Sequence, residues 1–218
     1  MKVHAFVPAK SVSNRVQNKN KLKIFGEALY VNALKTLSRS TEITNFYIDT
    51  ESENFINHAV SKVSKCSVMK RDLQYATNET DGNQLLLNEA NFSKADIYVQ
   101  LLCTSPFISI ETIDKGIRIL KENQEYDSVV AVKREKLYLW DESGPLYDIN
   151  NIPNSNTLSD TIIETMGLYI IRHETLISTK KRIGNKPYLL EVSQLEGIDI
   201  NYPEDYEFAQ IIERGLRG

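Results

Sequence analysis

The stretch VHAFVPAKSVSNRVQNKNKLKIF, residues 3–25, decides the fold of this chain. It begins with a short β-branched and aromatic run, typical of a buried strand, that ends at Pro8. A polar loop continues to Phe25, and over residues 27–39 apolar side chains recur at three-residue steps, which places them on one face of a helix. The stretch therefore predicts a strand, a long loop and a helix, a unit from which α/β folds are built.

The same alternation continues along the chain. The apolar pattern predicts further strands at residues 45–49, 68–69, 97–102, 128–132 and 163–171, and further helices at residues 53–63, 84–92, 110–123 and 172–178. Ser109 is the expected N-cap of the helix at 110–123, and the last helix is expected to open at Pro203 and stop at Gly215. This order predicts one α/β unit over residues 1–218, with a mainly parallel sheet covered on both faces.

Residues 136–160 interrupt the alternation. Two apolar stretches, residues 136–140 and 146–149, flank the turn-forming sequence DESGP, and a segment rich in Asn and Ser follows. The pattern predicts a hairpin that leaves the α/β core. Such an excursion either covers a pocket or pairs with another subunit, or it is a plain surface feature, and the sequence leaves these alternatives open.

Composition excludes several classes of protein. The 218 residues are 41% hydrophobic and 25% charged, with a net charge of -3, so a global electrostatic attraction to nucleic acid or to an anionic membrane is not expected. No apolar run is long enough for a signal peptide or a membrane span, so we expect a cytoplasmic protein. Cys66, Cys103 and the three histidines lack the spacing of a metal or disulfide framework.

The first loop carries an unusual excess of positive charge. No acidic residue precedes Glu27, whereas the cations before it are Lys2, Lys10, Arg15, Lys19, Lys21 and Lys23. Cationic side chains, hydroxyls and loop amides at the end of a strand suit a polyphosphate. The alternative is a solvated basic loop. The loop is not of the Walker A type, because no G-x-x-x-x-G-K sequence occurs in the chain.

At this loop the sequence resembles a known family. Residues 7–20, VPAKSVSNRVQNKN, are similar to the N-terminal signature of the CMP-sugar synthetases, the acylneuraminate cytidylyltransferase family. Further blocks resemble that family in the same order. They are IDTES at 48–52, RDLQYATN at 71–78 with TDGN at 80–83, LCTSP at 102–106, GLYI at 167–170 and IDIN at 198–201.

The resemblance implies a function and an architecture. Members of the family have a three-layer, Rossmann-like nucleotidyltransferase fold and transfer CMP from CTP to the anomeric hydroxyl of a 2-keto sugar acid, such as a sialic-acid-like nonulosonic acid. The reaction uses Mg²⁺, releases pyrophosphate and supplies activated sugars for surface polysaccharides. By the same likeness, the arm at about residues 136–160 would join two subunits into a homodimer.

The resemblance also implies roles for individual residues. Lys10 and Ser13 would bind the β- and γ-phosphates, Lys19 the α-phosphate, and Asn20 would lie beside the nucleotide, with Arg15 as a further cation for the leaving pyrophosphate. Asp199 and Asn201 would bind the metal, and Lys10, Lys19 and Asp199 would form the catalytic group. Further nucleotide contacts fall to Arg71, Asp81 and Asn83, and sugar contacts to Gln100, Thr104, Ser105 and Thr165.

Other readings of these residues stay open. Asp81 and Asn83 could cap the helix that follows them, Thr104 and Ser105 could form a turn, and an isolated Asp199 could be a cap or surface residue. The chain also has Ser11 and Val12 where many relatives carry glycines, Asn14 where a second lysine is usual, and Asn201 at the second acidic position of its block. The alternatives to the enzyme are therefore a non-catalytic nucleotide-binding relative and a nucleotidyltransferase for a different nucleotide or sugar.

Overall fold

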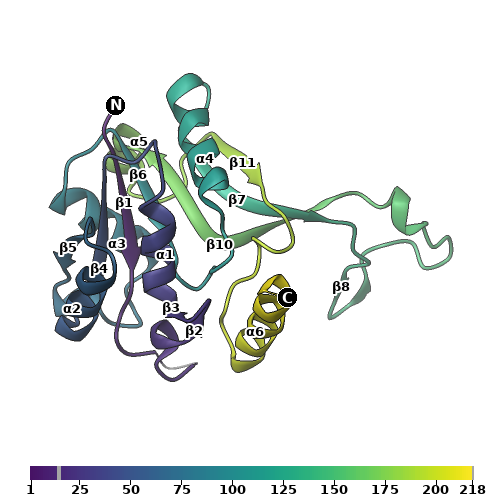
Figure 1. Cartoon of the computed structure of the whole chain (residues 1–218). Coiled ribbons are helices and arrows are strands. Elements are labelled where there is room, and N and C mark those ends of the chain that lie inside the picture. The colour runs from purple at the N-terminus through teal and green to yellow at the C-terminus, as the bar shows by residue number, and fades with distance from the viewer. Residues whose placement is uncertain (14–15, 218) are drawn as a thin grey trace.

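The computed structural model describes residues 1–13 and 16–217, and its centre is a seven-stranded sheet (Figure 1). The strand order is β11-β7-β10-β6-β1-β4-β5. The bounds are β1 Val3–Pro8, β4 Asn45–Thr50, β5 Ser67–Lys70, β6 Ile97–Leu101, β7 Ser128–Glu135, β10 Thr161–Arg172 and β11 Pro187–Glu191. Only β10 runs antiparallel to its neighbours in this sheet, β6 and β7, so the sheet is mixed but mainly parallel, as predicted.

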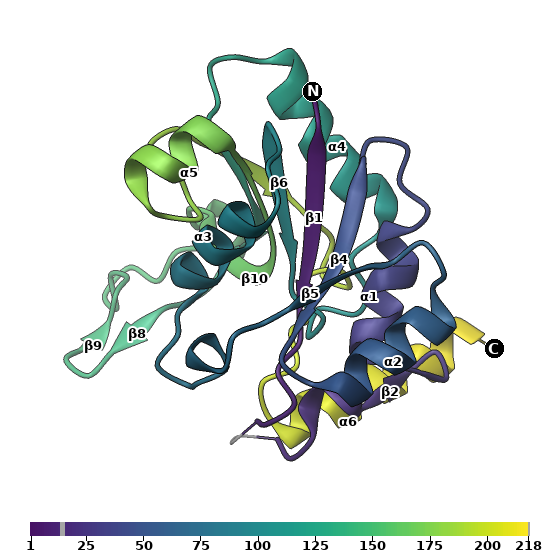
Figure 2. The same cartoon turned by 90° about the vertical axis from the view of Figure 1, so that its left-hand side faces the viewer.

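Helices cover both faces of the sheet (Figure 2). On one face lie α1 (Leu29–Leu37), α2 (Glu53–Lys62), α4 (Ile110–Glu122) and α6 (Pro203–Arg217), and on the other lie α3 (Gly82–Phe92) and α5 (His173–Thr179). Alternating side chains of β1 divide between the layers, because Ala5 and Val7 pack in the first apolar cluster and Phe6 in the second. The three-layer, Rossmann-like α/β fold is confirmed.

Most predicted helices and strands are found within a few residues of their expected bounds. Ser109 is the N-cap of α4, because its hydroxyl oxygen accepts a hydrogen bond from the Thr112 backbone N–H at 3.2 Å. The prediction that Gly215 stops the last helix is wrong, since α6 continues to Arg217. A glycine inside a helix costs about 1 kcal/mol relative to alanine, which is too little to end the helix by itself.

Short elements lie between the main ones. A hairpin of β2 (Lys23–Ile24) and β3 (Glu27–Ala28) joins the first loop to α1, and the segments Lys19–Lys21, Leu73–Tyr75 and Ser155–Thr157 are 3-10 turns. The predicted hairpin of residues 136–149 is present as β8 (Trp140–Asp141) and β9 (Gly144–Pro145), with shorter strands than expected.

Residues 136–160, here called the arm, project away from the sheet beyond the ends of β7 and β10 (Figure 1). The pairing of β7 with β10 continues out to the base of the arm, where Glu135 is opposite Thr161. Apolar side chains remain exposed along the arm. Those more than half exposed are Trp140, Leu146, Ile149 and Ile152.

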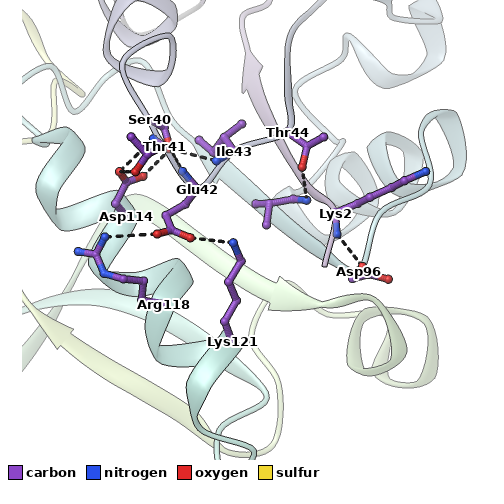
Figure 3. Close-up of polar contacts among 11 residues, drawn as sticks. Lys2, Ser40, Thr41, Glu42, Ile43, Thr44, Asp96, Asp114, Arg118 and Lys121 are labelled. Carbon is purple, nitrogen blue, oxygen red and sulfur yellow. Dashed lines mark hydrogen bonds and ion pairs between the residues drawn. The ribbon is translucent and has the colours of Figure 1, made fainter.

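The end of the sheet at which β1 begins is tied together by polar contacts (Figure 3). Glu42, in the loop between α1 and β4, accepts a hydrogen bond from Lys121 of α4 at 2.7 Å, and this bond lowers the pKa of the Glu42 carboxyl. Asp114 of α4 accepts bonds from Ser40 and Thr41 of the same loop. These contacts fix the connections at the end of the sheet where β1 enters it.

No helix in the described part of the chain is both long and apolar enough to cross a membrane.

Candidate active site

A cavity of about 240 Å³ opens where several parallel strands end. Its wall combines the end of β1 with the segments that follow β5 and β6 and with the loop that precedes α6. In α/β folds, ligands bind at this edge of the sheet. Seven of the predicted site residues line the cavity: Lys10, Lys19, Asn20, Arg71, Thr104, Asp199 and Asn201.

Two lysines of the first loop, Lys10 and Lys19, line the cavity, and each is held by a hydrogen bond to another segment. Lys10 Nζ donates a hydrogen bond to Asn78 Oδ1 at 2.5 Å, and Lys19 Nζ donates to the backbone oxygen of Ile200 at 3.0 Å. Asn20 is buried, and its Nδ2 donates to the Lys10 backbone oxygen at 2.8 Å. The loop thus brings two ammonium groups and an amide to one cavity, which suits a ligand with several phosphates.

The start of the loop is fixed by Glu51. One carboxylate oxygen, Oε1, accepts hydrogen bonds from the backbone N–H and the hydroxyl of Ser11 at 2.6 and 2.5 Å. Ser13 is half-buried and does not line the cavity. Arg15 and its neighbour Asn14 lie outside the described residues, so the proposed role of Arg15 stays a prediction.

Asp199 presents one carboxylate oxygen without a partner. Its Oδ1 is buried and receives no hydrogen bond within the described chain, whereas Oδ2 accepts from Asn201 Nδ2 at 2.5 Å. The neighbouring carboxylate, Asp205, accepts the backbone N–H groups of Asn201 and Tyr202, both at 2.8 Å. Asp205 therefore binds the backbone at the start of α6, and Asp199 is the carboxylate left for a ligand.

The residues around Asp199 fit one mode of magnesium binding. Among the described residues there is no group of three or more His, Cys, Asp or Glu side chains able to hold a metal ion without other ligands. Mg²⁺ bound to nucleotides usually takes one or two carboxylates, with phosphates and waters as the other ligands. Asp199, with its unpartnered oxygen, lines the same cavity as Lys10 and Lys19, which fits that mode.

Arg71 reaches the cavity wall from a buried ion pair. Its Nε and one terminal nitrogen donate to the two carboxylate oxygens of Asp49, at 2.9 and 2.6 Å, and that terminal nitrogen also donates to the Asp49 backbone oxygen at 3.0 Å. Burial by itself lowers the pKa of Arg71, but the hydrogen bonds and charge of Asp49 raise it above the ordinary value. The guanidinium is therefore fixed in position and permanently charged.

Two of the predicted nucleotide contacts lie away from the cavity wall. Asp81 is the N-cap of α3, because its carboxylate accepts from the Gln84 backbone N–H at 2.9 Å while Gln84 Oε1 accepts from the Asp81 backbone N–H at 3.0 Å. Asn83 Oδ1 accepts from the backbone N–H of Arg182 at 2.9 Å. Asp81 caps the helix, as the capping alternative anticipated, whereas Asn83 binds the backbone of a distant segment instead of capping α3.

We expect Asp81→Ala to lower the free energy of unfolding by about 1 kcal/mol, the usual loss for an N-cap, and to leave the affinity for nucleotide unchanged. Denaturant unfolding and a nucleotide titration of the same variant measure both quantities. A weakened nucleotide affinity without loss of stability would restore the predicted binding role of Asp81.

Three predicted sugar contacts are buried behind the cavity. Gln100 points toward α3, where its Nε2 donates to Glu89 Oε2 at 3.0 Å, and Thr165 Oγ1 donates to the Ala131 backbone oxygen at 3.1 Å. Ser105 is buried as well, and its hydroxyl has no partner within residues 1–13 and 16–217. Of the four predicted sugar contacts, Thr104 is the one that lines the cavity.

Sequence reasoning did not single out several residues of the wall. The additional lining residues are Pro8, Tyr75, Thr77, Thr80, Leu85, Leu102, Cys103 and Met166. Met166 takes the place expected of Thr165, because β10 has an irregularity between Glu164 and Tyr169 and Met166 adopts a left-handed φ of 61° there. For Tyr75 a signal was present, since it lies within the block 71–78 that resembles the family.

Comparison with known proteins bears on this site. The sequence model of the family described as Cytidylyltransferase matches residues 4–141. An N-acylneuraminate cytidylyltransferase of Escherichia coli O18:K1:H7 is 21% identical over 98% of this chain and 52% of its own length. An uncharacterized protein of Methanocaldococcus jannaschii is 26% identical over 59% of this chain and 51% of its own. The chain spans about half the length of the curated relatives that it matches.

Solved structures with low sequence identity share the fold. A CMP:2-keto-3-deoxy-manno-octonic acid synthetase complexed with CTP superimposes with a TM-score of 0.72 and 14% identity, covering 99% of this chain and 100% of that one. A 4-diphosphocytidyl-2C-methyl-D-erythritol synthase from Anaerococcus prevotii gives a TM-score of 0.71 and 13% identity, covering 98% and 96%. With the family match over residues 4–141, the chain belongs to the cytidylyltransferase family of nucleotidyltransferase enzymes.

Proposed function

We propose that this protein transfers CMP from CTP to the anomeric hydroxyl of a 2-keto sugar acid and releases pyrophosphate. The observation that carries the proposal is the composition of the cavity. Lys10 and Lys19 lie on the same wall as Asp199, whose Oδ1 has no partner within the described residues, in a chain of the cytidylyltransferase family.

The chemistry of nucleotidyl transfer explains why these side chains are needed. Negative charge accumulates on the phosphates as pyrophosphate leaves, and fixed cations in a partly closed site stabilise that charge. In the proposed reaction Lys19 contacts the α-phosphate and Lys10 the phosphates that leave. Mg²⁺, when bound, would neutralise part of the phosphate charge, and Asp199 is the residue that would hold it, with Asn201 as its neighbour.

We expect Lys19→Met to lower turnover by more than tenfold, since loss of one electrostatic contact to the reacting phosphate typically costs about 3 kcal/mol. Lys21→Met is the matched control, because Lys21 belongs to the same short turn and lies 5.7 Å from the centre of the Phe55 ring, away from the cavity lining. Steady-state kinetics of the two variants decide the matter. Equal activities would remove Lys19 from the reaction.

A sugar acid is the proposed acceptor for two reasons. The six sequence blocks resemble enzymes that act on 2-keto sugar acids, and two of the similar proteins carry names of the same kind, an N-acylneuraminate cytidylyltransferase and an octonic acid synthetase. Thr104, which we propose contacts the acceptor sugar, lines the cavity together with Leu102 and Met166.

A thermal-shift comparison of CTP, UTP, GTP and ATP, each with Mg²⁺, tests the nucleotide. A ligand at a hundred times its dissociation constant stabilises a protein by about 2.7 kcal/mol, so the shift is measurable. The proposal expects stabilisation by CTP alone. Stabilisation by another nucleotide would support a nucleotidyltransferase that uses that nucleotide in place of CTP. No stabilisation by any of the four, with or without 2-keto sugar acids, would contradict nucleotide binding and with it the proposed function.

We further propose that the arm pairs two copies of the chain. Trp140, Leu146 and Ile152 are each about 60% exposed on a segment that projects from the core, and burial against a second arm would remove this apolar area from water. Light scattering at micromolar concentration should give a dimer for the natural chain and a monomer for Trp140→Ser combined with Leu146→Ser. A monomeric natural chain would refute the pairing.

A further inference from the structure

A fully buried carboxyl group lies behind the nucleotide cavity without a cation of its own. Glu89 of α3 has no exposed surface, and its Oε2 accepts a hydrogen bond from Gln100 Nε2 at 3.0 Å. The other oxygen, Oε1, has no donor within the described chain. An ionised carboxylate in this position would be expensive, because burial disfavours charge and an acceptor atom would be left unsatisfied.

The nearest charged groups are already paired with each other. Arg71 uses Nε and a terminal nitrogen on the two carboxylate oxygens of Asp49, at 2.9 and 2.6 Å. The charge of Asp49 and a side-chain hydrogen bond to it both raise the pKa of Glu89. A hydrogen bond between two carboxyl groups needs a proton on one of them, because an ionised carboxylate has no donor.

The surroundings assign that proton to Glu89. Burial is the largest effect that raises the pKa of Glu89 well above the ordinary value, and the negative charge of Asp49 raises it further, against a smaller opposing effect of Arg71. The tyrosines of the same layer are engaged elsewhere, since Tyr47 bonds to Ser93 and Tyr98 to the Ala95 backbone. Asp49 and Arg71 are therefore the charged groups that act on Glu89.

We propose that Glu89 is a positioning residue that carries its proton in the folded protein and donates it in a hydrogen bond to Asp49, which in turn holds Arg71 at the wall of the nucleotide cavity. The contacts form one series, in which Gln100 fixes Glu89, Glu89 fixes Asp49, and Asp49 fixes the guanidinium. The protonated form gives the otherwise unpartnered Oε1 a hydrogen bond to make. An effect of Glu89 on the enzyme's KM for CTP rests on the proposed function, in which Arg71 contacts the nucleotide.

The first test compares the pH dependence of unfolding for the natural chain and for Glu89→Gln, a neutral isostere that can still donate to Asp49. Above the ordinary pKa of a glutamate, the unfolded natural chain releases the proton while the folded one keeps it, so its stability falls as pH rises toward the raised folded pKa. Glu89→Gln has no ionisable group at this position, so its free energy of unfolding does not fall for this reason. We expect the two stability curves to diverge as the pH rises above the ordinary pKa of a glutamate, in favour of the variant; parallel curves would overturn the assignment of the proton.

The second test separates positioning of Arg71 from general support of the fold. Glu89→Leu has a similar volume but no donor, so we expect the KM for CTP to rise about tenfold or more, whereas Glu89→Gln should stay within about twofold of the natural chain. Gln100→Met removes the hydrogen-bond donor to Glu89 and should also raise the KM for CTP, but by a smaller factor. It replaces Glu89→Leu as the test variant if Glu89→Leu does not fold. An equal rise in the KM for CTP in Glu89→Gln and Glu89→Leu would overturn the proposal, because the glutamine side chain retains the hydrogen-bond donor.

The two tests also separate this proposal from the proposed function. If CTP neither binds to the natural chain nor reacts, the proposed function fails, and the diverging or parallel pH curves still decide whether Glu89 carries a proton. If CTP reacts normally while both Glu89 variants keep the natural KM, the proposed function stands and the positioning role of Glu89 fails.

Discussion

Replacing Asp199 by asparagine is expected to lower turnover about a hundredfold or more while leaving the fold intact. Asp199 lines the cavity, and its Oδ1 is buried with no partner within the described residues, so removing its charge takes away the group best placed to hold a metal ion with the nucleotide phosphates. Kinetics over a range of Mg²⁺ concentrations measure the effect, and the variant should also need more Mg²⁺ for half-maximal activity.

Asp205→Asn is the matched control for this prediction. Asp205 lies six positions further along the chain, but its carboxylate accepts two backbone N–H groups at the start of α6, both at 2.8 Å. Its loss should lower stability by about 1 kcal/mol, as for other caps, with little change in turnover. An Asp199→Asn enzyme with natural turnover and natural Mg²⁺ dependence would contradict the assignment of Asp199.

Replacing Arg71 by methionine should lower the free energy of unfolding by about 3–5 kcal/mol, the usual loss when one partner of a buried ion pair is removed. The side chains of Arg71 and Asp49 are 2% and 0% exposed, so the variant leaves the Asp49 carboxylate in the interior without its cation. Denaturant unfolding measures the change directly.

The adjacent residue provides the control. Lys70 also pairs with a carboxylate, that of Glu53, but both side chains are more than 60% exposed. Exposed ion pairs contribute about 0–1 kcal/mol, so Lys70→Met should unfold almost as the natural chain does. Similar stabilities for the Arg71→Met and Lys70→Met variants would show that the buried pair does not stabilise the fold.

The periodic parts of the fold could be predicted from the sequence. Six of the seven strands of the central sheet and the main helices follow from apolar spacing, because each buries one face in an adjacent layer. Strand β11 was not predicted. It has five residues, begins with Pro187 and exists through its pairing with β7, a contact between segments about sixty residues apart in the sequence.

The part of the site that lies within local sequence motifs could be predicted. Lys10, Lys19, Asn20 and Asp199 lie in blocks that resemble the family, and all four line the cavity. Gln100 lies behind the wall, because side chains alternate along β6 and its own points toward α3.

Non-local geometry explains the other differences. Met166 lines the cavity instead of Thr165 because β10 is irregular at this point, and apolar spacing does not reveal such bulges. The pairing of Arg71 with Asp49 depends on the order of the strands in the sheet, where β4 and β5 are neighbours and bring together two positions 22 residues apart in the sequence.

Transfer of the α-phosphorus of CTP is the most direct measurement of the proposed reaction. Purified protein is incubated with Mg²⁺, CTP labelled at that atom and a panel of 2-keto sugar acids, and the products are separated from CTP and free CMP. The proposed reaction predicts a labelled CMP-sugar, formed with an equal amount of pyrophosphate, from at least one acceptor. The Asp199→Asn variant should form far less of this product. If the label remains in CTP with every acceptor and CTP does not stabilise the protein, the proposed CMP transfer is contradicted.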